Sequence, residues 1–226
     1  MNLKIINRLF HIKLFIFIVI ISVYSCKKEN KEFDLGYINN NVYVNNFFKF
    51  KIDLPKEWIP KTDDFYRKNN EVVKEVLAGD DRVKNRILDK DEINTVNLIG
   101  LFKNKENLSI DLNPNILITA KNLEYYPDIT NINDDLNQTV SFLQDSKIED
   151  SGIKIIYLSK EFEKIIIGNQ VFYKLDATFN YNGLIVNQEV YSTIRNNFSL
   201  AIILSFKNKN DKQLMHNILT SINFYE

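Results

Sequence analysis

The sequence has a single cysteine, Cys26, so the chain forms no disulfide within itself. Six glycines and four prolines in 226 residues exclude collagen-like and low-complexity chains. Because 29 Lys and Arg balance 29 Asp and Glu, the chain lacks the basic field expected of a nucleic-acid-binding protein. Aromatic residues, in contrast, make up 12% and supply enough material for a packed core. At roughly 100 to 200 residues per domain, the length indicates one domain with an appendage.

Recognised catalytic and cofactor motifs are also absent. The sequence contains no H-E-x-x-H, no G-x-S-x-G, no P-loop and no G-x-G-x-x-G. Only one histidine, His216, lies beyond residue 26, which is too few nitrogen ligands for a zinc site. We expect His216 to be an exposed residue of the last helix. The sequence therefore predicts no catalytic residue, no metal and no cofactor, and it leaves the binding residues undefined.

Carboxylates are plentiful, and they keep one enzymatic alternative open. A glycoside hydrolase needs only two carboxylates at a suitable separation. The candidates are Asp128, Asp134, Asp135, Asp145, Glu149 and Asp150. None of them lies in a recognisable signature, and no EF-hand spacing indicates calcium. Their expected place is the solvated surface, with a hydrolase that uses an acidic pair as the alternative.

The first 25 residues have the pattern of a secretory signal. Three positive charges, Lys4, Arg8 and Lys13, precede an apolar stretch of ten residues from Leu14 to Val23. As a helix this stretch is about 15 Å long at ~1.5 Å per residue. It is too short for a bilayer whose hydrocarbon core is roughly 30 Å thick. A removable signal is therefore favoured over a transmembrane anchor.

The tetrapeptide Val23-Tyr24-Ser25-Cys26 resembles the lipobox of bacterial lipoproteins, although Tyr24 stands where a small residue is usual. The resemblance implies cleavage before Cys26 and acylation of that cysteine. The alternative is an ordinary signal followed by an inert thiol. We expect a signal at residues 1–25, a lipidated cysteine and polar tether at 26–40, and one domain at 41–226. Lys27 follows the cysteine in place of the Asp that signals inner-membrane retention, so outer-membrane placement is allowed.

Hydrophobic periodicity predicts an α+β domain. A strand is expected over Phe47–Leu54, with Phe48 and alternate residues buried, and Trp58 is expected to fill the core. Further strands are predicted at Thr95–Phe102, Leu108–Leu112 and Ile116–Lys121, and near Ile153. Helices are predicted over Thr62–Leu77, Asp80–Leu88 and Ile129–Leu143.

The C-terminal third shows the sharpest pattern. Asn182-Gly183 favours a type I′ hairpin turn, since both residues tolerate positive φ. That turn places Tyr181 opposite Leu184, Phe179 opposite Val186, Leu175 opposite Val190, and Val171 opposite Ile194. A second turn at Asn196-Asn197 leads into a strand that is apolar on both faces, and Asp211 is expected to cap a final helix whose apolar face includes Leu214. The predicted fold is an antiparallel sheet flanked by helices on both faces, an α/β/α sandwich.

Packing residues at both ends of the domain carry a resemblance to a known family. The motif Phe48-x-Phe50-x-Ile52-x-Leu54-Pro55-x-x-Trp58 resembles the opening of PsbP-like domains, and Ile218-Leu219-x-Ser221-Ile222-x-Phe224 is similar to their last element. The resemblance covers most of residues 40–226. It implies an α/β/α sandwich that serves mainly for binding or assembly, with no catalytic residues to transfer.

These features predict a non-catalytic, lipid-anchored protein of the cell envelope that binds or assembles another envelope component through its sheet edge or a helix-lined groove. The expected location is the outer membrane, on its periplasmic face or at the surface. The expected partners are the membrane, through the N-terminal lipid, and an envelope protein, but no nucleic acid. A periplasmic or surface hydrolase with an acidic pair and a ligand carrier with an apolar cavity remain the alternatives.

Overall fold

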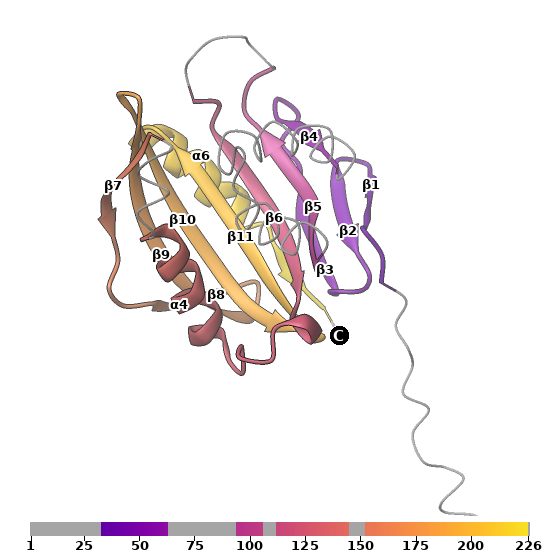
Figure 1. Cartoon of the computed structure of the whole chain (residues 1–226). Helices are drawn as coiled ribbons and strands as arrows, with labels where there is room; N and C mark the ends of the chain where they lie inside the picture. Colours follow the sequence, from indigo (N-terminus) through magenta and orange to yellow (C-terminus); the bar gives the residue numbers. More distant parts are fainter. Residues whose placement is uncertain (1–32, 63–93, 106–111, 145–151, 226) are drawn as a thin grey trace, which may run out of the picture. The chain divides into compact units, whose positions relative to one another are not determined.

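Two antiparallel sheets dominate the fold (Figure 1). The computed structural model describes residues 33–62, 94–105, 112–144 and 152–225, and the fold below lies within the unit Asp34–Glu226. The large sheet contains β4 (Ile59–Lys61), β5 (Thr95–Phe102), β6 (Asn115–Asn122), β11 (Phe198–Phe206), β10 (Leu184–Arg195), β9 (Gln170–Tyr181) and β7 (Ile153–Leu158) in that order, with β8 (Glu163–Ile167) also paired to β9. The small sheet contains β1 (Tyr37–Asn39), β2 (Val42–Asn45), β3 (Phe50–Asp53) and β12 (Asn223–Phe224).

Two asparagine-containing turns set the register of the central strands. Asn182 and Gly183 have φ values of 50° and 89°, and Asn196 and Asn197 have 53° and 64°, so both predicted turns are confirmed. Three of the four predicted pairs between β9 and β10 occur. The pairing ends at Tyr173 and Ser192, so the fourth pair, Val171 with Ile194, lies beyond it.

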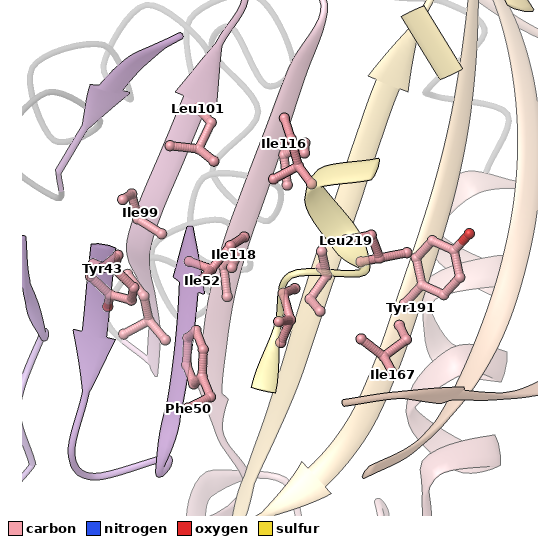
Figure 2. Packing of buried hydrophobic residues seen from close by; sticks show 14 of the residues in the cluster. Tyr43, Phe50, Ile52, Ile99, Leu101, Ile116, Ile118, Ile167, Tyr191 and Leu219 are labelled. Atoms are coloured by element: carbon pink, nitrogen blue, oxygen red, sulfur yellow. The ribbon is translucent and has the colours of Figure 1, made fainter. Parts of the chain in front are cut away.

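The main core lies between the large sheet, the small sheet and helix α6 (Lys209–Leu219). Figure 2 shows part of this cluster, in which residues of β2 and β3 lie with residues of β5 and β6. Phe48, Phe50 and Ile52 are buried as predicted, and Trp58 belongs to the same cluster. A core of this composition supplies the apolar burial that stabilises the domain.

Helices α4 (Ile132–Leu143) and α6, both in the described ranges, contact different faces of the large sheet (Figure 1). Helix α6 reaches Glu189 of β10, whereas helix α4 reaches Ser199 of β11, and the pairing of β10 with β11 places Glu189 and Ser199 on opposite faces. The predicted antiparallel sheet is confirmed. The predicted sandwich with helices alone on both faces is not confirmed. On the face that α6 contacts, the small sheet provides part of the cover.

Several elements begin at other residues than predicted, and for the two helices named above the capping residues explain the difference. Helix α4 begins at Ile132, three residues later than predicted, because Asn131 and Asp134 form a capping box there. Asn208 rather than Asp211 caps α6, and Leu214 is exposed. The strand predicted over Phe47–Leu54 begins only at Phe50, because residues 46–49 form a turn in which Lys49 has a φ of 55°. The predicted helix Thr62–Leu77 apart from Thr62, the predicted helix Asp80–Leu88, and all but the last residue of the strand Leu108–Leu112 lie outside the described residues.

Candidate functional site

The predicted lipidation site lies outside the described residues. This holds for Cys26 and for the preceding Val23, Tyr24 and Ser25. It also holds for three of the candidate carboxylates, Asp145, Glu149 and Asp150. These remain predictions from the sequence.

The described candidate carboxylates on α4 hold the helix in place. Asp134 accepts hydrogen bonds from the Thr130 hydroxyl and backbone, and these lower the pKa of Asp134. Asp135 is buried, forms an ion pair with Lys121 and accepts a hydrogen bond from Ser199 at 2.5 Å. Asp128 is exposed. Two of the three described candidates therefore anchor α4, Asp134 through the cap of the helix and Asp135 through its contacts with the sheet.

A different polar cluster lies between the large sheet and α6. Its centre is Glu189 of β10, whose side chain is 2% exposed. One carboxylate oxygen, Oε1, lies 2.6 Å from Lys212 Nζ. The other, Oε2, lies 2.6 Å from His216 Nε2 and accepts a hydrogen bond from the Tyr191 hydroxyl at 2.9 Å. Lys212 and His216 are four residues apart on α6, so both face the same carboxylate.

Three further charges surround this centre on the adjacent strand pair. Lys174 Nζ of β9 lies 3.1 Å from Asp176, 3.4 Å from Glu163 of β8 and 3.9 Å from Glu189. Burial alone would lower the pKa of Lys174, but these carboxylates together raise it. The cluster thus alternates positive and negative groups rather than concentrating one sign.

The electrostatics indicate a structural anchor rather than an acid–base centre. Burial would raise the pKa of Glu189, but hydrogen bonds from Lys212, His216 and Tyr191 outweigh it and lower the pKa. A general acid near neutral pH needs the opposite shift. Burial and the neighbouring Glu189 raise the pKa of Tyr191, so its hydroxyl stays protonated as a donor.

The expectation for His216 is wrong in its main point. Its side chain is 35% exposed, but its Nε2 atom lies 2.6 Å from Glu189 Oε2, so the ring is held by a contact within the domain. Sequence reasoning missed Glu189 altogether. One signal was available, because Glu189 and Tyr191 alternate onto one face of the predicted strand while Lys212 and His216 share one face of the predicted helix.

Because folding lowers the pKa of Glu189, the free energy of unfolding should depend on pH in the acid range. A carboxyl group whose pKa is lowered by folding stabilises the native state above its ordinary pKa, about 4.5, and loses that contribution as pH falls through the lower folded value. We therefore expect the difference in free energy of unfolding between the wild type and Glu189→Gln to shrink below pH 4.5. Urea titrations of both proteins across this range measure it, and a pH-independent difference contradicts the assignment.

Exposed apolar side chains gather on the edge strand β7. Ile156 and Tyr157 are 56% and 54% exposed. The strand pairs with β9 on one side, with an irregularity between Ile155 and Tyr157, and no other strand in the described ranges pairs with its free side. The free side therefore presents backbone N–H and C=O groups beside apolar side chains.

Metal-binding clusters and membrane-spanning helices are both absent from the part of the chain that the structure describes. No group of three or more His, Cys, Asp or Glu there could hold a metal ion. No helix among the same residues is long and apolar enough to span a membrane.

Comparisons with known proteins give structural likeness only. No family model matches the chain, and no curated protein matches it. A protein of Bacteroides thetaiotaomicron VPI-5482 matches with 10% identity and a TM-score of 0.43 over 84% of this chain, which spans only 50% of that protein. Cyanobacterial PsbP of Synechocystis sp. PCC 6803 matches with 12% identity and a TM-score of 0.47, over 84% of this chain and 99% of that one.

A third likeness is to LpqN, which is involved in cell envelope biogenesis of Mycobacterium tuberculosis. It has 12% identity and a TM-score of 0.39, over 78% of this chain and 83% of LpqN. Identities of this size with TM-scores below 0.5 assign neither a family nor an activity to this chain.

Proposed function

We propose that this chain is a non-catalytic, lipid-anchored protein of the cell envelope, with a domain that binds an envelope protein through strand β7. The anchor rests on the short apolar segment before Cys26 and on the lipobox-like residues Val23 to Ser25. Acyl chains on Cys26 would tether the domain firmly, since each buried CH₂ contributes ~0.8 kcal/mol. Lys27 after the cysteine is compatible with the outer membrane.

We also propose that the domain is a PsbP-like α/β/α variant, in which a four-stranded sheet shares one face with α6. The packing residues that carry the resemblance in sequence support this, because Phe48, Phe50 and Ile52 are buried in the main core together with Trp58. A PsbP-like fold by itself implies no activity, substrate or partner for this chain.

One observation supports the binding function: no strand in the described parts of the chain pairs with the outer edge of β7. Native edge strands are commonly protected by charge, proline or a covering segment. Within β7 the only charged residue is Lys154, and the strand has no proline. Backbone groups spaced along an open strand recognise another extended segment, and exposed side chains such as Tyr157 select it. The partner we propose is therefore a protein that adds a strand to this edge.

The rival hydrolase finds no support in the described carboxylates. Glu189 and Asp176 are direct neighbours across β9 and β10, yet lysines pair with both of them. Hydrogen bonds from Lys212, His216 and Tyr191 lower the pKa of Glu189, whereas protonation of a leaving group requires a raised pKa.

Photo-crosslinking in intact cells tests the proposed edge. We expect p-benzoylphenylalanine in place of Lys154 to form a discrete adduct with one envelope protein. The adduct should disappear when Tyr157→Lys is added, because a lysine on the edge opposes strand addition by a partner.

The matched control places the same crosslinker at Tyr125, which is also about half exposed (53%) but lies in a 3₁₀ turn away from β7. No such adduct is expected there. An adduct at Lys154 that survives Tyr157→Lys, or the same adduct from Tyr125, argues against binding through β7.

A further inference from the structure

The small sheet has an outer surface that faces away from the core. Directly paired residues of antiparallel strands share a face. Tyr37 pairs with Val44, and Val44 pairs with Lys51, so these three lie on one face. The neighbouring row, Tyr43 with Ile52, points into the core and is buried.

This outer surface combines apolar and aromatic groups with charged side chains of both signs. Tyr37 is 52% exposed, and the nearby Leu35 is 42% exposed. Lys51 and Asp53 are both exposed on the outer face of β3, on either side of the buried Ile52. Lys49 Nζ lies 5.8 Å from the centre of the Tyr225 ring. Aromatic rings with a polar end, together with lysines that extend their charge to water, are typical of side chains at a membrane–water interface.

The length of the preceding chain keeps this surface near the predicted anchor. Asp34 follows Cys26 by eight residues, and β1 begins three residues later. At most ~3.6 Å per residue, eight residues span no more than about 29 Å. The tether at residues 26–40 contributes three lysines, Lys27, Lys28 and Lys31, which are balanced by Glu29, Glu32 and Asp34; two of the lysines directly follow Cys26. Anionic lipid headgroups attract basic segments that lie within a Debye length of the surface.

We infer that the outer surface of the small sheet, defined by Tyr37, Val44 and Lys51, rests on the headgroup region of the bilayer that holds the lipid anchor. This contact depends on the proposed anchor at Cys26, because a free domain would have only a small apolar area to bind with. It gives the domain one preferred orientation, in which β7, an edge strand of the large sheet, belongs to a separate surface (Figure 1).

The lone cysteine provides a clean test in the full-length lipidated protein. Acylation occupies the Cys26 thiol, so Tyr37→Cys gives a chain with one reactive thiol that can carry a bimane fluorophore. The control is Tyr157→Cys, because the two tyrosines have nearly the same exposure and both lie on edge strands. Each labelled protein is placed in vesicles of phosphatidylethanolamine and phosphatidylglycerol that contain lipid with a nitroxide headgroup.

We expect the nitroxide lipid to quench the label at position 37 severalfold more strongly than the label at position 157. Equal quenching at the two positions would mean that the domain has no preferred face, and stronger quenching at 157 would mean that another face docks. Either result overturns the inference while the anchor stands. Labelling of two thiols per chain would show that Cys26 is not acylated, and would overturn the anchor and this contact together. Unchanged far-UV circular dichroism shows that both variants are folded.

Discussion

Replacing Cys26 with serine is expected to move the protein from the membrane fraction to the soluble fraction. The change removes the only thiol that can be acylated. The apolar stretch from Leu14 to Val23 would be about 15 Å long as a helix at ~1.5 Å per residue, too short to span the bilayer in place of the lipid. The effect should be close to complete, since the tether's few lysines give only weak attraction to anionic lipid. Fractionation of cells that express each form, followed by immunoblotting, measures the shift.

A matched control for this experiment is Ser25→Ala, which keeps a small residue before the cysteine and should leave the protein membrane-bound. Globomycin, which blocks the lipoprotein signal peptidase, should cause the unprocessed wild-type chain to accumulate. Membrane association of Cys26→Ser equal to that of the wild type would refute the lipid anchor.

Glu189→Ala is expected to lower the free energy of unfolding by about 2–4 kcal/mol, because it leaves several donors around a buried position without their acceptor. Tyr191 loses its acceptor inside the domain. Lys212 and His216 are partly exposed and regain some hydration, which keeps the loss below the upper end for buried ion pairs. Urea denaturation followed by tryptophan fluorescence of Trp58 measures the change.

The control for Glu189 is Glu163→Ala, at the rim of the same cluster. Glu163 lies 3.4 Å from Lys174, but its side chain is 66% exposed. Exposed ion pairs contribute roughly 0–1 kcal/mol, so this change should have little effect. A similar loss in both variants would contradict the view that Glu189 is the centre of the anchor of α6.

Local signals made the C-terminal hairpins predictable. Asn182-Gly183 determines the turn chemistry and thereby the register, and the apolar face of β9 follows from period-two alternation. Burial of Phe48 and Trp58 followed from the same kind of pattern. In such segments the residues that determine the structure are neighbours in sequence.

The small sheet and the Glu189 cluster depend on contacts between distant residues. Strands β1 and β12 have only three and two residues, too few for a periodic pattern, and β12 pairs with β3 across most of the chain. Likewise, Glu189 meets His216 only because α6 packs on the sheet in one particular position. A carboxylate in a strand is ordinarily expected to be solvated, so the role of Glu189 could not be inferred from the sequence of the strand alone.

Mass spectrometry of the N-terminal peptide from membrane-extracted protein tests the central claim most directly. The predicted result is a chain that begins at Cys26 and carries a diacylglyceryl group on sulfur, with residues 1–25 removed. Finding instead a chain that begins at Met1, or a Cys26 that bears no lipid, would contradict the lipid-anchored envelope protein proposed above.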